Sequence, residues 1–293
     1  MNDEYRAWQL DFYRRPLTDD SGNPLWELLI CDADMTFTYG EFCPQPEASA
    51  PWLRSQLQAA CDRAGGWPTH KELFRPQAVS LTEVACRDLP VAVKPRRDTQ
   101  VIKQWLKQRA VWYPTLSNYS GDPYEPISLD RPAPAPIADH LMGDSWQFAA
   151  LSPADLQRLH QAPIPILSAP GKLSPVNLGL PSTLAIPGIV IDGGRQSMRL
   201  AQWLQATEPV MLQYIAGMPD GVLLEAGLAD RWILATFTDD DVAAAARTFT
   251  ERKLAAKGLH FLLIRPDDSG MTYTALWILQ STAAKAVEMK QLS

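Results

Sequence analysis

The stretch from Trp8 to Asp32 constrains the fold of this chain more than any other part of the sequence. From Trp8 to Tyr13 the residues alternate with the two-residue period of a β-strand that has one face buried and the other toward polar surroundings. A second, almost wholly apolar arm runs from Leu25 to Cys31. The residues between the arms are rich in Asp, Asn, Gly and Pro, which favour turns. The stretch therefore predicts a β-hairpin.

Size and composition exclude several classes of protein. A chain of 293 residues that is 46% hydrophobic and 20% charged is globular and long enough for two domains. No apolar run approaches the ~20 residues that cross a bilayer, so no integral membrane segment is expected. The N-terminus shows neither a signal nor a transit peptide pattern, which predicts a cytoplasmic protein. The cysteines form no CxxC pair, so we expect reduced, buried thiols and no zinc site; they are Cys31, Cys43, Cys61 and Cys86.

The order of the predicted elements assigns the first half of the chain to the mixed α/β class. After the hairpin, strands are predicted at 36–42, 72–74 and 91–93, and helices at 49–64, 77–88 and 98–110. The resulting order, βββαβαβα, is that of ribonuclease H-like domains. Element order supports a fold prediction and no activity.

A proline-rich segment separates two predicted domains. Six prolines lie between Pro114 and Pro136, together with Ser, Asn and Gly, and such a composition suits a linker. We predict an N-terminal α/β domain at 1–113, a linker at 114–145 and a C-terminal α/β domain at 146–293. Within the last, strands are predicted at 189–191, 210–215, 222–225, 232–237, 259–264 and 272–279, and helices at 196–205 and 239–257.

An internal similarity suggests that the second domain is a related mixed-sheet domain. Residues 91–107 align without gaps with residues 189–205, and each copy predicts a strand, a tight turn and a helix. In this alignment, the tripeptide Gln104-Trp105-Leu106 is matched to Gln202-Trp203-Leu204. Chance similarity between two amphipathic strand and helix units is the alternative, and the sequence leaves both interpretations open.

Asp11 is the residue whose position most suggests catalysis. It lies on the polar face of the first strand, where metal-dependent ribonuclease H-like enzymes hold a carboxylate. Two-metal hydrolysis needs several convergent acids around metals ~4 Å apart. The other acids are missing, because Asp62 lies at the far end of its helix and the strand at 72–74 is followed by Arg75. The sequence predicts no catalytic residue and no metal site, and a metal-dependent nuclease is kept as an alternative.

A basic segment from Arg87 to Arg109 predicts a nucleic-acid contact. It holds seven basic residues against two acidic ones, a local charge of +5 in a chain whose net charge is −6. Phosphate binding requires clustered positive charge, and Trp105 offers a stacking face for an unpaired base. The alternatives are that Trp105 belongs to the core and that Lys103 and Lys107 form an ordinary solvated face. The predicted RNA-binding residues of the segment are Arg87, Lys94, Arg96, Arg97, Lys103, Lys107 and Arg109.

The residue order of the hairpin resembles that of a known family. Residues 8–16 read WQLDFYRRP and residues 26–30 read WELLI, which is similar to the opening of the Tab-two/Atab-two family of RNA-binding proteins of chloroplasts and cyanobacteria. In that family the second residue of the first segment is Glu, whereas this chain has Gln9. The resemblance spans nearly the whole chain. Further matching stretches are Ser145 to Phe148, Leu224 to Leu228, Asp230 to Leu234 and Ala275 to Leu279.

The resemblance implies a non-catalytic RNA-binding protein that promotes translation of a photosystem I subunit mRNA and photosystem biogenesis. It implies an A/U-rich mRNA leader as the partner, with the ribosome or photosystem assembly factors as further partners, and neither DNA nor a cofactor. The absence of a transit segment fits a bacterial member. Besides the nuclease, a protein-interaction scaffold for photosystem assembly is an alternative function.

A C-terminal Trp-Leu-Leu tripeptide is associated with RNA binding in this family. It maps to Trp277-Ile278-Leu279, where the middle Leu has become Ile. The resemblance therefore implies that Trp277, Ile278 and Leu279 bind RNA. The residues themselves lie in an apolar strand, which favours a role in folding instead, and both interpretations stay open.

Overall fold

The computed structural model describes residues 7–281 and divides the chain into two compact units. The first unit is Met1–Asp130 and the second is Arg131–Ser293. The boundary lies within the segment predicted as a linker, 114–145. Part of that segment packs on the first unit, since the amide of Ser120 donates to the carbonyl of Pro16 over 3.0 Å.

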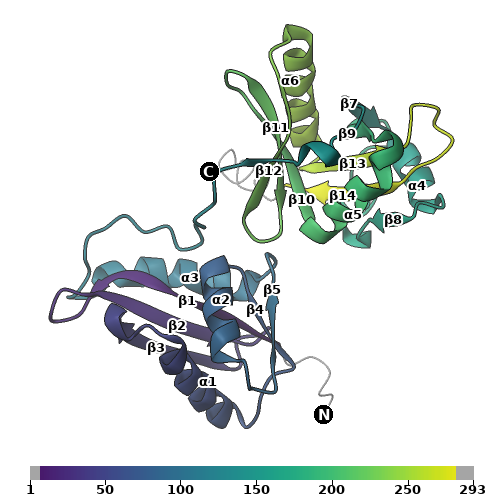
Figure 1. Cartoon of the computed structure of the whole chain (residues 1–293). Helices are drawn as coiled ribbons and strands as arrows, with labels where there is room; N and C mark the ends of the chain where they lie inside the picture. The colour runs from purple at the N-terminus through teal and green to yellow at the C-terminus, as the bar shows by residue number, and fades with distance from the viewer. Residues whose placement is uncertain (1–6, 282–293) are drawn as a thin grey trace. The chain divides into compact units, whose positions relative to one another are not determined.

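The first unit is built on a five-stranded mixed sheet (Figure 1). Its strands are β1 (Ala7–Thr18), β2 (Pro24–Cys31), β3 (Thr38–Pro44), β4 (His70–Leu73) and β5 (Ala92–Pro95), in the spatial order β3-β2-β1-β4-β5. Strands β1, β2 and β3 pair antiparallel, which confirms the hairpin, and β4 and β5 continue the sheet in parallel with β1. The predicted order βββαβαβα is observed, while its likeness to ribonuclease H stays a prediction.

Three helices cover the two faces of this sheet: α1 (Ala50–Ala64), α2 (Pro76–Ala85) and α3 (Gln100–Trp112) (Figure 1). Helix α1 begins at the predicted N-cap, where the side chain of Ser49 accepts a hydrogen bond from the amide of Trp52, and ends at Gly65 in the left-handed conformation. It packs on the face that carries Phe12, whose ring stacks on Trp52 with centroids 5.3 Å apart. Helix α3 lies on the other face, where Gln9 Oε1 accepts from the amide of Ile102 over 3.0 Å.

The prediction that one face of β1 lies toward polar surroundings is wrong. Trp8 and Phe12 are fully buried as expected, but Asp11 is 0% exposed and Gln9 only 9% exposed. The polar face is covered by α3 and by residues 113–130, so its charges are neutralised by neighbouring side chains and not by water. This arrangement creates the buried polar network described below.

The second unit contains two sheets. One has the order β7-β9-β13-β14-β8, with β7 (Ser145–Leu151), β8 (Ile166–Ser168), β9 (Ile186–Asp192), β13 (Leu259–Arg265) and β14 (Ala275–Gln280). The other has the order β10-β11-β12-β6, with β6 (Ala135–Pro136), β10 (Pro209–Ile215), β11 (Asp220–Ala226) and β12 (Asp230–Phe237). Both units are therefore of the predicted mixed α/β class.

Helices α4 (Pro153–Gln161), α5 (Ser197–Thr207) and α6 (Asp240–Ala255) complete the second unit. Helices α5 and α6 were predicted from the sequence, whereas β6, β7, β8 and α4 were not. The signal for α4 was present, because Ser152 and Asp155 form a capping box at its start. The repeated segment is a strand followed by a helix in both copies, β5 with α3 and β9 with α5, and a common origin of the two units stays a prediction.

No helix within residues 7–281 is both long and apolar enough to cross a membrane. All four cysteines are buried and carry free thiols.

His260 on β13 is held neutral in the core of the second unit. Its Nε2 accepts a hydrogen bond from the amide of Leu212 over 2.9 Å, and its Nδ1 lies 2.8 Å from the carbonyl oxygen of Gly258, so the proton is on Nδ1. Burial, and next the charge of Lys253, lower the pKa of His260 to about 3. The unfolded chain takes up a proton near pH 6.5 and the folded chain does not, so stability falls as the pH drops from 6.5 toward 3.

We expect the second unit to lose about 2 kcal/mol of stability through His260 between pH 6.5 and pH 5, at roughly 1.4 kcal/mol per pH unit. Chemical denaturation at pH 7 and pH 5 measures this loss. The control is His260→Gln, whose side-chain oxygen still accepts from Leu212 but does not titrate. Equal pH dependence in the two proteins would contradict the assignment.

Candidate nucleic-acid interface

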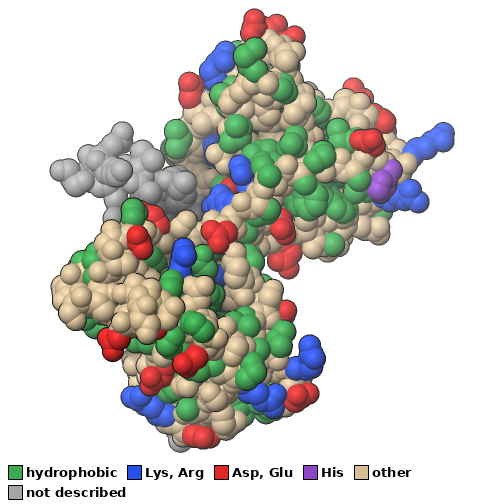
Figure 2. Space-filling model, turned by 60° about the vertical axis from the view of Figure 1, so that its left-hand side comes forward, with side chains coloured by type: hydrophobic (Ala, Val, Ile, Leu, Met, Phe, Trp, Pro, Cys, Tyr) green, Lys and Arg blue, Asp and Glu red, His purple; other side chains and the backbone are tan. Residues whose placement is uncertain are grey.

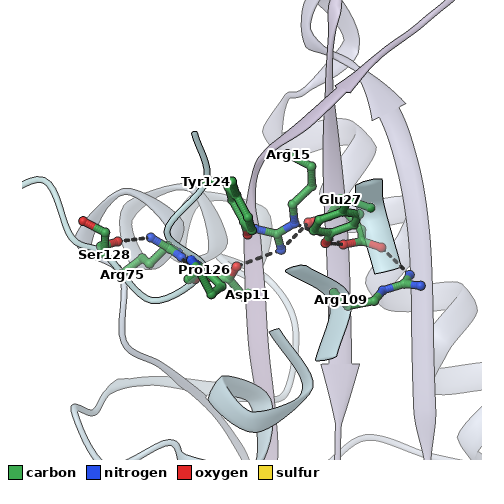
Figure 3. Close-up of polar contacts among 9 residues, drawn as sticks. Asp11, Arg15, Glu27, Arg75, Arg109, Tyr124, Pro126 and Ser128 are labelled. Carbon is green, nitrogen blue, oxygen red and sulfur yellow. Dashed lines mark hydrogen bonds and ion pairs between the residues drawn. The ribbon is translucent and has the colours of Figure 1, made fainter. Parts of the chain in front are cut away.

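A buried network of charges fixes the polar face of the first sheet (Figure 3). Arg15 lies between two carboxylates: its Nη2 is 2.8 Å from Asp11 Oδ2, and its Nε is 3.0 Å from Glu27 Oε2. Arg75 binds the other oxygen of Asp11 over 2.8 Å, and Arg109 binds the other oxygen of Glu27. The side chains of Asp11, Arg15 and Glu27 are fully buried. Three guanidinium groups thus neutralise two buried carboxylates.

The network also holds the segment that follows α3. Arg75 donates to the carbonyl oxygens of Pro126 and Ser128, and Arg15 donates to the hydroxyl of Tyr124 over 3.1 Å. Burial by itself lowers the pKa of Arg15, but Asp11 and its other anionic partners raise it well above its ordinary value. Burial is also the main cause that raises the pKa of Tyr124. Arg15 therefore stays charged and Tyr124 stays a neutral hydroxyl.

Asp11 does not fit the role of a metal ligand in this arrangement. Both of its oxygens are bound by guanidinium groups, one from Arg15 and one from Arg75. Within the described residues, His, Cys, Asp and Glu side chains do not gather in groups of three that would hold a metal ion. The position at which a nuclease carboxylate was considered is thus an ion-paired structural site.

Basic side chains gather where the parallel strands β4 and β5 end. Leu73 and Pro95 are paired at the carboxyl ends of these strands, so Arg75 and Arg97 follow at the same edge of the sheet. Lys103 on α3 joins the two loops: its Nζ lies 4.9 Å from the ring centre of Phe74 and donates to the carbonyl oxygen of Arg97.

Neighbouring basic and acidic residues alter the pKa of Lys103. Burial is the largest cause that lowers the pKa of Lys103; Asp98 opposes it, and Arg97, Arg75 and Lys107 lower it further. We call Arg75, Arg97, Lys103 and Lys107 the cation cluster; Arg75 is buried and paired with Asp11, so it acts on the cluster from the interior. On the face of the molecule drawn in Figure 2, basic and acidic side chains are interspersed. A chain with a net charge of −6 would therefore attract a polyanion through a local cluster of this kind.

The other predicted RNA-binding residues of the basic segment lie in different surroundings. Arg87 and Lys94 are exposed, and exposed Arg96 has its Nε 3.7 Å from Glu72. Arg109 points inward to Glu27, and its guanidinium lies 4.4 Å from the ring centre of Trp112. The charge of Arg109 is therefore already paired within the first unit.

The tripeptide Trp277-Ile278-Leu279 is buried in β14, between β13 and β8. Trp277 and Leu279 face the core cluster shared with Leu212 and Phe249, whereas Ile278 faces the cluster on the opposite side of the sheet. The predicted apolar strand is confirmed. Its side chains pack on both faces, and their direct contact with RNA stays a prediction.

Three residues of the buried network were not predicted as site residues from the sequence: Arg15, Arg75 and Tyr124. A signal existed for Arg15, because residues 11, 13 and 15 of a strand share one face and Arg15 therefore had to lie beside Asp11. Tyr124 comes from the proline-rich segment, whose path the sequence does not determine.

The fold and the cation cluster define a two-unit α/β protein whose first sheet has a basic edge. Family models match both units: "RNA-binding protein Tab2/Atab2 N terminal" matches residues 7–109, and the C-terminal domain of the same family matches residues 124–280. The chain belongs to this Tab2/Atab2 family, the one that its hairpin resembles.

Two curated relatives are similar along almost the full length of the chain. The Zea mays protein "Protein TAB2 homolog, chloroplastic" is 27% identical over 280 residues, which cover 94% of this chain and 71% of the relative. The Arabidopsis thaliana protein of the same name is 26% identical over 284 residues, which cover 94% of this chain and 75% of the relative.

Solved structures give a weaker likeness. The HTLV-2 integrase catalytic core domain matches with a TM-score of 0.26 and 15% identity, over 38% of this chain and 76% of that one. A chain of a simian T-cell lymphotropic virus intasome matches with a TM-score of 0.25 and 14% identity, over 50% of this chain and 65% of that one. Scores this low support no conclusion about fold or activity.

Proposed function

We propose that this protein binds single-stranded RNA through the basic edge of its first unit. The observation that carries the proposal is the geometry of the cation cluster: Arg75 and Arg97 follow the paired carboxyl ends of β4 and β5, and Lys103 donates to the carbonyl oxygen of Arg97. In α/β sheets, ligands bind outside the carboxyl ends of the parallel strands, which is where this cluster lies. The chain belongs to a family described as RNA-binding, so RNA is the polyanion that we propose.

The family resemblance supports a proposal for the biological role. We propose that the RNA is an A/U-rich mRNA leader and that binding promotes translation of a photosystem I subunit mRNA and photosystem biogenesis. Ribosome or photosystem assembly factors are the proposed further partners, and the cytoplasm is the proposed location. The relatives are named as chloroplastic proteins, so the location proposed here differs from theirs.

Neutralising two members of the cluster tests the proposal. In the double variant Arg97→Gln, Lys107→Gln we expect weaker binding to oligouridylate, because phosphate contacts are lost. The slope of log affinity against log salt concentration should become shallower by about 0.7 for each phosphate contact that is lost, the value for a single strand. Fluorescence anisotropy from 50 to 200 mM salt measures both quantities.

The matched control is Arg54→Gln, Arg63→Gln, which removes the same charge from exposed positions of α1. This helix packs on the other face of the sheet, so affinity and slope should stay near those of the wild type. Equal losses in the two double variants would mean that net charge alone drives binding. RNA affinity that does not depend on salt would overturn the basic-edge proposal, and a lack of RNA binding would favour a protein-interaction scaffold.

A further inference from the structure

A surface pocket of about 300 Å³ lies between α3 and the loop that joins β2 to β3. Its lining residues are Met35, Gln100, Val101, Gln104, Trp105 and Gln108. All of them belong to the first unit. The volume lies at the lower end of the range for small-ligand pockets, so it suits one small planar group and not a large cofactor.

The loop side of the pocket is held in place by its own hydrogen bonds. Asp32 accepts from the amide of Phe37 over 3.0 Å, and the ring of Phe37 stacks on Trp8 with centroids 5.1 Å apart. Between them, Met35 has a φ of 62° and an exposed side chain. The tight loop thus presents a polarizable, apolar side chain opposite α3.

Trp105 forms the aromatic part of the pocket. The indole packs partly on the core cluster that contains Leu29, Ile102 and Leu106, and it also lines the pocket. A ring that is fixed by the core and accessible from outside loses little freedom when a second ring stacks on it. Trp105 is therefore both a core residue and a stacking platform.

The polar part of the pocket is a row of three glutamines. Gln100, Gln104 and Gln108 follow one another at four-residue spacing, so they lie in a line on the exposed face of α3. A glutamine amide offers donors and an acceptor, which is what the edge of a nucleobase requires. The Nε2 of Gln100 already donates to Asp98 over 3.1 Å, so Gln104 and Gln108 are the members of the row that we assign to the base. Carboxylates are absent from the lining, so nothing in it repels a phosphate chain.

The cation cluster reaches the same helix. Lys103 and Lys107 lie four residues apart, and Lys107 follows Gln104 by three residues, so the lysines flank the glutamine row. Trp105 lies two residues from each lysine and therefore on the far side of the glutamine row, so an RNA strand must cross this row for its phosphates to meet the lysines and one base to meet Trp105. Around the circumference of α3, the two lysines thus come first, the glutamine row next and Trp105 last.

We propose that this pocket binds one unpaired base of single-stranded RNA, stacked on Trp105 and hydrogen-bonded by the glutamine row. The inference rests on the proposed function and adds a base-binding site to the phosphate contacts. It requires no duplex and no cofactor. Binding should therefore depend on the presence of bases, which contacts to phosphate alone would not produce.

Comparing oligouridylate with an abasic ribose-phosphate chain of the same length tests the site. The wild type should bind the base-containing chain about tenfold more tightly, the magnitude expected for one stacked base. Trp105→Leu and Gln104→Ala should reduce this preference and leave the salt dependence unchanged. Gln104 is exposed, so its replacement should not destabilise the fold. Gln58→Ala is the matched control, because Gln58 is an exposed glutamine on α1.

A second measurement needs no variant. Oligouridylate that carries 5-iodouracil should, on irradiation, crosslink to Trp105 or Met35, as mapped by mass spectrometry. If the wild type binds neither chain, the proposed function fails. If it binds both chains equally and with salt dependence, or if crosslinks fall only outside the pocket, the base site fails while the proposed function stands.

Discussion

Replacing Arg15 with methionine is expected to lower the free energy of unfolding of the first unit by about 3–5 kcal/mol, the usual cost of removing one partner from a buried ion pair. Arg15 is only 2% exposed and joins Asp11 to Glu27. Its removal leaves an oxygen of each carboxylate without a guanidinium partner in the interior, where an uncompensated charge is costly. Methionine fills much of the vacated volume, so the loss measures charge more than packing.

The control for this prediction is Arg14→Met, at the neighbouring exposed position. A surface change of this kind usually alters stability by no more than about 0.5 kcal/mol. Hydrogen exchange of the amides of β1 and β2 should be used to measure the loss, because these amides report on the first unit alone. Similar losses for Arg14→Met and Arg15→Met would contradict a specific role of the network.

Replacing Trp277 with alanine is expected to destabilise the second unit by about 3–5 kcal/mol, as for other buried tryptophans. Trp277 is 3% exposed and packs in the cluster that contains Leu212 and Phe249. The change leaves a cavity between two sheets. Hydrogen exchange of β13 and β14 measures the loss, and exposed Trp112→Ala serves as the matched control with a small effect.

The same experiment separates folding from RNA contact at the tripeptide. We expect any loss of RNA binding in Trp277→Ala to follow the fraction of unfolded protein, and to recover in Trp277→Phe at low temperature. A variant that is fully folded and still unable to bind RNA would contradict the packing role. It would support direct contact by Trp277, Ile278 and Leu279, as the family resemblance implies.

The regular elements were predictable where local signals agreed. The hairpin at 8–32 combined alternation with turn residues, and α1 combined the Ser49 cap, an apolar stripe and Gly65. β7 was missed although its first four residues alternate between exposed polar and half-buried aromatic side chains. Element ends shifted by two or three residues where pairing or a tight loop decided them, as at β3, which begins at Thr38 after the Asp32 loop.

The candidate site was predictable only in part. The charge of the segment from Arg87 to Arg109 is visible in the sequence, but its spacing does not tell which cations lie together. Lys103 meets Arg97 and Arg75 because β4 and β5 end at the same edge. Arg109 belongs to the same segment, yet Glu27 draws it into the network.

The sequence by itself determined the α/β class, the strand and helix order of the first unit, and the family to which the chain belongs. These properties depend on local periodicity and residue order, which a single chain displays directly. Only the tertiary structure decided that Asp11 is an ion-paired core residue and that Trp105 faces both the core and a pocket. Both outcomes depend on contacts between residues far apart in the chain, with Asp11 meeting Arg75 and Met35 lying opposite α3, and no local pattern encodes such distances.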